Sequence, residues 1–103
     1  MKRAGYIARV KKEGIEEYKR YHKKVWPEMR QALKRAGFHK FTIFMRPNGV
    51  TFAYCEVDES LARAFENVSK EEVNARWGAV MAPLLGDIEG QPLVELEEVF
   101  NLE

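Results

Sequence analysis

The feature that most constrains the fold is a change in the spacing of apolar residues near Gly14. Before this glycine, residues 3 to 10 alternate between two faces, one of which is apolar. Such alternation is typical of a strand with one buried face. After it, apolar and aromatic residues recur at steps of three and four from Ile15 to Ala36, which predicts a helical segment.

Pro27 interrupts this helical segment. A proline has no backbone N–H to donate, so the helix must kink or restart near residues 24 to 26. Pro27 suits the first position of a new helix, and Gly37 suits the residue that follows its end. In either geometry, His22 and Trp26 are expected close to a helix terminus, where side chains are accessible.

A hairpin is expected next. Residues 38 to 45 and 50 to 57 are rich in β-branched and aromatic residues, which favour strands. The Arg-Pro-Asn-Gly sequence between them, residues 46 to 49, is typical of a tight turn. The two strands should therefore pair in antiparallel fashion.

Two helical stretches and a final strand complete the pattern. The first helix should begin at Asp58 or Ser60 and run to about residue 67. Residues 69 to 72 have the sequence of a capping box, which predicts a second helix to about Ala82. The final strand is expected over residues 93 to 102, with a bulge or an edge where two glutamates disturb the alternation.

The order β-α-β-β-α-β predicts a ferredoxin-like α+β fold in one domain, residues 1 to 103. Both helical layers should cover one face of a four-stranded antiparallel sheet. The other face still carries apolar side chains and needs a cover. A second copy packed sheet to sheet would supply it, so we expect a homodimeric α/β barrel.

Composition excludes several classes of function. The formal net charge is +1 with both signs interspersed, which gives no basis for a nucleic-acid partner. Cys55 is the single cysteine, so no intrachain disulfide is possible, and Cys/His metal spacing is absent. No apolar run approaches the roughly 18 residues of a membrane span, and no leader sequence is evident. We therefore expect a cytoplasmic protein without a metal site or a membrane partner.

An aromatic column is the strongest candidate for a functional site. Tyr18, His22 and Trp26 are four residues apart and share one helix face. This column could be ordinary core or a site. In a site, His22 would transfer protons and Tyr18 would hydrogen-bond, while Trp26 and Trp77 would offer flat faces to a sugar. Arg76 would be a surface charge or a ligand for sugar hydroxyls.

The whole chain, residues 2 to 102, resembles the L-rhamnose mutarotase family. The residues that carry the resemblance are Tyr18, His22, Trp26-Pro27-Glu28, Gly37, Arg76-Trp77, Met81 and the ending Leu96 to Leu102. The resemblance implies a homodimeric ferredoxin-like barrel that interconverts the α and β anomers of a 6-deoxy sugar without a cofactor. It also implies that His22 is the proton donor and that Tyr18 and Trp77 bind the sugar.

The sequence departs from the family pattern at two positions. Phe41 stands where the family has a sugar-binding tyrosine, and Gly78 stands where it has the second tryptophan of a pair. Both changes remove sugar contacts and leave His22 in place. The pocket could therefore accept another deoxy sugar or a pentose, or it could be rebuilt from other residues such as Tyr54.

Two other functions fit a small dimeric α/β barrel. One is a monooxygenase, either cofactor-free or haem-dependent, in which the histidine would act as a base or an axial ligand. The other is a sugar-binding module without catalytic activity. Haem binding or oxygen uptake would indicate the first, and saturable sugar binding without faster anomer exchange would indicate the second.

Overall fold

The computed structural model describes all residues from 1 to 103. In chain order the elements are β1 (Lys2–Val10), the 3-10 turn η1 (Lys12–Gly14), α1 (Ile15–Lys23), α2 (Pro27–Ala36), β2 (Phe38–Met45), β3 (Val50–Val57), α3 (Leu61–Val68), α4 (Glu72–Met81), the 3-10 turn η2 (Ala82–Leu84), β4 (Leu85–Gly86) and β5 (Leu93–Leu96). None of these helices is long and apolar enough to pass through a bilayer.

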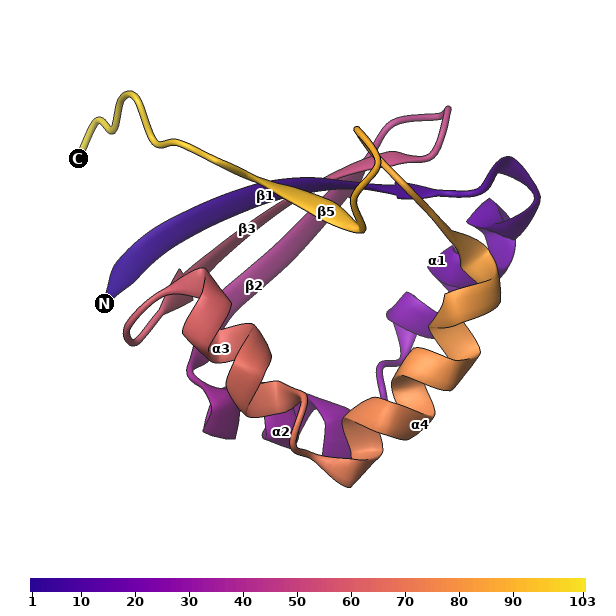
Figure 1. Ribbon diagram of the computed structural model, residues 1–103, viewed down its shortest axis with the longest axis horizontal. Coiled ribbons are helices and arrows are strands. Elements are labelled where there is room, and N and C mark those ends of the chain that lie inside the picture. Colours follow the sequence, from indigo (N-terminus) through magenta and orange to yellow (C-terminus); the bar gives the residue numbers. More distant parts are fainter.

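The sheet has the predicted ferredoxin-like order, but it has five strands rather than four, because the short β4 was not predicted. β3 pairs with β2 on one side and with β1 on the other, and the free edge of β1 pairs with β5 and with the two-residue β4. All pairs are antiparallel. The helices lie in an arc along one side of the sheet, and no helix covers the other side (Figure 1).

The helical segment breaks at Pro27, as expected. α1 ends at Lys23, and α2 begins with Pro27 at its first position. α2 ends before Gly37, whose φ of 106° is left-handed and whose N–H donates to the carbonyls at the end of the helix. The prediction that His22 and Trp26 flank a helix break is therefore confirmed.

The start of α4 differs from the expected capping box. Ser69 does not cap α4: its hydroxyl donates to the carbonyl oxygen of Glu66 at 2.6 Å and so closes α3. α4 begins later, at Glu72. Ser60 caps α3 as one of the two predicted candidates, since its hydroxyl oxygen accepts from the N–H of Arg63 at 3.0 Å.

The last strand is shorter than the predicted residues 93 to 102. β5 ends at Leu96, opposite Gly5 of β1. In this register Val99 would face Lys2, the first residue of β1, so residues further along the chain have no strand to pair with. Residues 97 to 103 run on as a tail without regular structure (Figure 1).

A β-bulge in β2 shapes the floor of the helix-covered face. The pairing of β2 with β3 shifts by one residue between His39 and Thr42. Lys40 takes a positive φ of 51° within this shift. The extra residue keeps both Phe38 and Phe41 on the helix side, where their rings stack at 5.0 Å.

The main core fills only part of the space between sheet and helices. It is formed by Tyr6 of β1 together with buried residues of β2, β3, α2 and α3, and by Val73 of α4. No residue of α1 belongs to it. The helix that carries the aromatic column is therefore held beside the core rather than in it.

Candidate active site

Two members of the predicted aromatic column lie against each other on α1. The rings of Tyr18 and His22 stack with their centroids 4.0 Å apart and their planes 25° apart. One helical turn separates the two residues, which is the spacing at which side chains of a helix meet. Both side chains are partly buried.

The backbone of α1 fixes the tautomer of His22. Its Nδ1 lies 2.8 Å from the carbonyl oxygen of Tyr18. A carbonyl oxygen can only accept, so Nδ1 carries the hydrogen and Nε2 of the neutral ring has a free lone pair. Nε2 has no protein hydrogen-bond partner, and no fully enclosed side-chain nitrogen or oxygen lacks one, so Nε2 is accessible.

Burial also sets the charge of His22. Loss of solvent lowers the pKa of the imidazole below its usual value of 6.5, and the hydrogen bond to the Tyr18 carbonyl opposes this only in part. Near neutral pH the ring is therefore uncharged. A neutral imidazole with an accessible Nε2 is a proton acceptor that can become a donor in the next step.

Trp77 of α4 contacts residues on both sides of the break between α1 and α2. Its ring meets His22 edge to face at 5.4 Å and Trp26 at 5.0 Å. A third edge-to-face contact, at 6.1 Å, is with Tyr21. The structure thus brings Tyr18, His22, Trp26 and Trp77 into one aromatic group. Sequence reasoning missed Tyr21, although its spacing of three from Tyr18 was a usable signal.

The sheet contributes aromatic rings to the same region. Phe41 lies on the helix side of β2 and meets the ring of Tyr6 edge to face at 6.3 Å. Tyr6 also meets Phe65 of α3 at 5.7 Å. Sequence reasoning placed Tyr6 on the buried face of the first strand but did not count it among the site residues.

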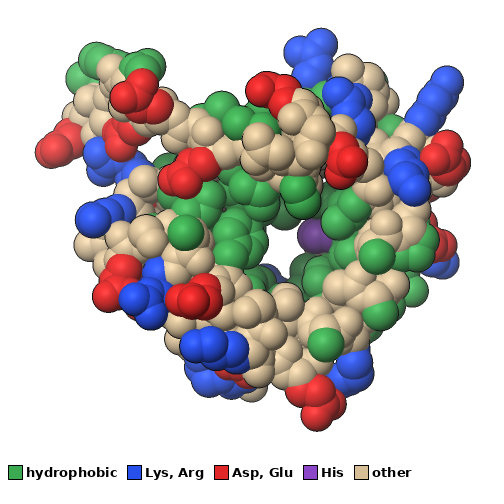
Figure 2. Space-filling view, in the orientation of Figure 1, with side chains coloured by type: hydrophobic (Ala, Val, Ile, Leu, Met, Phe, Trp, Pro, Cys, Tyr) green, Lys and Arg blue, Asp and Glu red, His purple; other side chains and the backbone are tan.

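The space between sheet and helices is not completely filled. Figure 2 shows a hollow at the centre of the molecule, between the sheet and the helices. It is bordered mainly by hydrophobic side chains, with a histidine at its edge. His22 of α1 contacts Trp77 of α4, so the side chain of His22 lies between these two helices, on the helix side of the molecule. We call this space the central hollow. The aromatic groups described above, from α1, α4 and the sheet, lie around this space.

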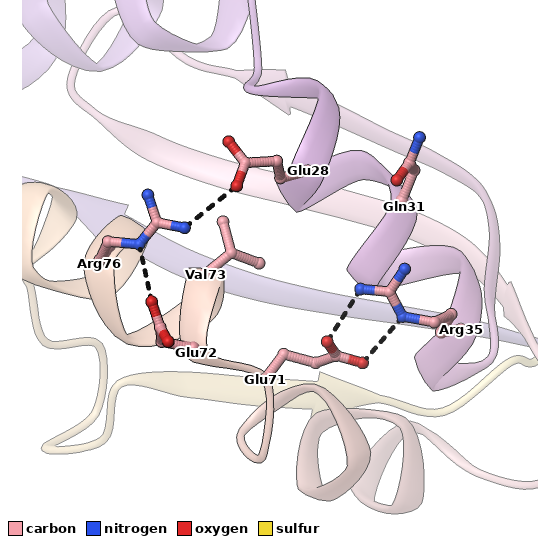
Figure 3. Close-up of a pocket in the computed structure, with 7 residues that line it drawn as sticks. All are labelled: Glu28, Gln31, Arg35, Glu71, Glu72, Val73 and Arg76. Carbon is pink, nitrogen blue, oxygen red and sulfur yellow. Dashed lines mark hydrogen bonds and ion pairs between the residues drawn. The ribbon is translucent and has the colours of Figure 1, made fainter.

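Arg76 lies apart from this group. Its guanidinium Nη2 is 3.2 Å from Glu28, and its Nε is 3.6 Å from Glu72 (Figure 3). Both carboxylates are on the outer surface of the helices, where Arg76 is itself exposed. Of the two roles that the sequence left open for Arg76, the structure agrees with a surface charge and does not place it with the sugar-binding candidates.

The outer cleft between α2 and α4 has little to offer a sugar. It has a volume of about 340 Å³ and only one apolar lining residue, Val73. Besides the Arg76 pairs, Arg35 binds both oxygens of Glu71, at 2.9 and 3.1 Å (Figure 3). These charged groups already satisfy one another, so a neutral ligand would have to compete with ion pairs.

Tyr54 does not rebuild the pocket. It lies on the outer face of the sheet, because its neighbours Ala53 and Cys55 are the residues of β3 that face the helices. Its hydroxyl donates to a carboxylate oxygen of Glu56 at 3.0 Å. The suggestion that Tyr54 replaces a missing sugar contact is therefore wrong.

The arrangement supports proton transfer next to aromatic surfaces. No group of three or more His, Cys, Asp or Glu side chains lies together in a way that could hold a metal ion. Cys55 is fully buried, and burial raises the pKa of its thiol to about 11, so it is not poised as a nucleophile. His22 is the one group of the hollow that can change charge near neutral pH.

Comparisons with known proteins show which family the chain belongs to. The model of the family described as L-rhamnose mutarotase matches residues 3–102. The L-rhamnose mutarotase of Bacillus subtilis is 38% identical over the whole of both chains, and that of Lactiplantibacillus plantarum is 34% identical over the same extent. The crystal structure of L-rhamnose mutarotase from Formosa agariphila superposes with a TM-score of 0.79 at 28% identity and covers both chains completely. The chain belongs to the L-rhamnose mutarotase family.

Proposed function

We propose that this protein is an L-rhamnose mutarotase, which interconverts the α and β anomers of L-rhamnose or a related deoxy sugar. The observation that carries the proposal is the state of His22. Its Nδ1–H is held by the Tyr18 carbonyl at 2.8 Å, and its Nε2 is free beside an aromatic group. The family match over nearly the full chain gives this geometry a reaction and a substrate class.

Proton transfer alone accounts for the reaction. The neutral Nε2 of His22 accepts the proton of the anomeric hydroxyl O1–H. The imidazolium so formed donates it to the ring oxygen O5 as the C1–O5 bond breaks and the C1=O1 aldehyde forms. Both oxygens are bonded to C1, so one nitrogen can reach each in turn. Rotation about C1–C2 and the reverse steps close the ring on the other face, with the Tyr18 hydroxyl or a water assisting.

The aromatic side chains suit a deoxy sugar. The C–H faces of a pyranose pack on flat rings, and a 6-deoxy sugar adds a methyl group with no hydroxyl to satisfy. Trp77 supplies apolar surface in contact with His22, and Trp26 packs against Trp77. Phe41 supplies apolar surface from the sheet, and Tyr18 supplies a hydroxyl. Burial raises the pKa of Tyr18, so its hydroxyl stays protonated and able to donate.

We further propose that the protein acts as a homodimer, joined through the outer face of the sheet. Phe44 and Phe52 are 62% and 43% exposed on that face, which no helix covers. The tail beyond β5 adds three more exposed apolar residues, Val99, Phe100 and Leu102. Exposed large apolar side chains on an uncovered sheet face and on a neighbouring segment are typical of an interface. The cytoplasmic location expected from the sequence stays a prediction.

Saturation-transfer NMR tests the function directly. Anomer exchange should be faster than in buffer for L-rhamnose, and a screen with L-fucose and common aldoses ranks the substrates. His22→Ala should slow catalysed exchange by about 10²–10⁴-fold while the circular dichroism spectrum is retained.

His39→Ala is the matched control. His39 lies on the outer face of the sheet, opposite Glu56, and its Nε2 contacts Asp58 at 2.9 Å. Its loss should leave exchange unchanged. If His22→Ala exchanges anomers as fast as the unmodified protein, His22 is not the proton-transfer group. If no sugar exchanges faster than in buffer, the protein is not a mutarotase.

A further inference from the structure

We propose that the hydroxyl of Tyr6 is a further sugar-binding group, which hydrogen-bonds to the substrate from the sheet side of the central hollow. The inference rests on the proposed function, because it assigns a further contact to the same sugar. It concerns a residue that belongs to β1, whereas His22 and Tyr18 belong to α1.

The ring of Tyr6 is firmly placed. β1 lies inside the sheet, and Tyr6 pairs with the small Ala53 on one side and with Glu95 on the other. The residue is only 9% exposed and belongs to the main core. Edge-to-face contacts with Phe41 at 6.3 Å and with Phe65 at 5.7 Å fix the ring from two directions.

The hydroxyl at the end of this buried ring has no protein partner. Every enclosed side-chain nitrogen or oxygen in the protein makes a hydrogen bond, and the Tyr6 hydroxyl makes none. Its oxygen must therefore reach open space although the ring does not. Because Tyr6 faces the helices, that space is the central hollow.

The surroundings keep this hydroxyl a neutral donor. Burial is the main cause that raises the pKa of Tyr6, and the nearby Tyr18 hydroxyl raises it further. Tyr18 stacks on His22, on the helix side of the same space. Tyr6 and Tyr18 thus present two hydroxyls to the hollow, one from the sheet and one from the helix beside His22.

Such a hydroxyl has a clear role in a site with apolar walls. A sugar entering the hollow gives up water at each of its hydroxyls, and a hydroxyl that finds no new partner weakens binding. The ring faces of Trp77, Trp26 and Phe41 consist of carbon atoms, which neither donate nor accept conventional hydrogen bonds. Tyr6 can do both, so its position selects sugars that place an oxygen next to it.

Tyr6→Phe removes the hydroxyl and keeps the ring contacts. The two tryptophans of the chain, Trp26 and Trp77, are in contact at the site, so tryptophan fluorescence can report sugar binding without turnover. L-Rhamnose and its singly deoxygenated analogues are titrated into both proteins. The dissociation constant for L-rhamnose should rise by about 2- to 12-fold in Tyr6→Phe, the loss of one neutral hydrogen bond.

The analogues separate a direct contact from a structural effect. The analogue that lacks the contacted oxygen should bind the unmodified protein less tightly and should lose nothing further in Tyr6→Phe. Tyr54→Phe, which removes a hydroxyl from the outer face, should bind every sugar as before.

The proposal is overturned if Tyr6→Phe binds every sugar as tightly as the unmodified protein. It is also overturned if the variant loses the same factor on every analogue, because that pattern indicates a rearranged site rather than a contact. Both results leave the mutarotase function intact. If the unmodified protein binds L-rhamnose without speeding anomer exchange, the proposed function fails while the Tyr6 contact is still measured.

Discussion

The Nδ1 atom of His22 lies 2.8 Å from the backbone carbonyl oxygen of Tyr18, one turn earlier in the same helix. The orientation of the imidazole is therefore set by the helix that carries it. No carboxylate is hydrogen-bonded to the ring, so nothing of opposite charge holds the imidazolium form. Helix geometry fixes where the proton sits, and burial fixes how readily a second proton is bound.

Catalysed anomer exchange should depend on pH through His22. Burial disfavours the imidazolium, so folded His22 binds its second proton only at a pH below about 6.5. In the proposed mechanism the neutral ring is the proton acceptor that starts the reaction. The catalysed rate, after subtraction of the rate in buffer, should therefore be flat at neutral pH and fall as the pH drops through the lowered pKa. NMR titration of the His22 ring should give the same midpoint, with His39→Gln used to assign the signals. A rate that rises on acidification across this window would contradict the mechanism.

Trp77 should support both the site and the fold. Trp77→Ala removes ring contacts with Tyr21, His22 and Trp26 at once. The free energy of unfolding should fall by about 2–3 kcal/mol, and anomer exchange should slow because His22 loses the ring beside it. Urea denaturation and saturation-transfer NMR measure the two effects. Trp77→Phe should lie between the two proteins in both measurements. Equal stability of all three would show that Trp77 is not part of the packing.

Two glycines should respond to alanine in opposite directions. Gly49 has a φ of 94°, and a Cβ there would collide with the carbonyl oxygen of Val10. Gly49→Ala should therefore lower the free energy of unfolding by at least about 2 kcal/mol. Gly78 lies in α4 with open space around its Cβ position, so Gly78→Ala should raise it by about 0.5–1 kcal/mol. Urea denaturation of the pair decides, and a loss of stability in Gly78→Ala would refute the second expectation.

The C-terminal tail should be needed for dimerisation. Val99, Phe100 and Leu102 are 87%, 77% and 83% exposed. Replacing all three by serine should convert a dimer to a monomer in sedimentation velocity, because their apolar surface then no longer favours burial. Glu103→Gln, at the end of the same tail, is the control and should remain dimeric. A monomeric unmodified protein would rule out the dimer, and a dimeric triple variant would place the interface elsewhere.

The fold was accessible from the sequence because each boundary is marked by local chemistry. Pro27 begins α2 and Gly37 follows its end, and the turn that ends at Gly49 separates the two strands of the hairpin. Where a sequence signal is compatible with two local structures, the observed one can differ from the predicted one. Ser69 can start one helix or close another, and here it closes α3. β5 ends at Leu96, directly before the two glutamates that disturb the alternation, and β1 is too short to pair with residues beyond Val99.

The site was only partly accessible. Spacing along one helix identified Tyr18 and His22, because their contact is local. Whether a side chain lies near the hollow depends on which side of its strand or helix faces the hollow. This is the case for Tyr6, Tyr54 and Arg76. The alternation of a strand divides its residues into two groups but leaves the function of each side to tertiary structure. The order of the sheet places Tyr6 under the helices and Tyr54 on the outer face, and α4 turns Arg76 outward to Glu28.

The main core includes no residue of α1, so the packing that stabilises the fold and the candidate site occupy different parts of one sheet face. Packing against α2 and α3 stabilises the native state, and the part of the same face next to α1 is the part in which we propose that the sugar binds. Substitutions that retune substrate choice can therefore accumulate around α1 without loosening the scaffold. In the proposed site, a bound sugar would fill space that the chain leaves empty, and it should therefore protect α1 from local unfolding.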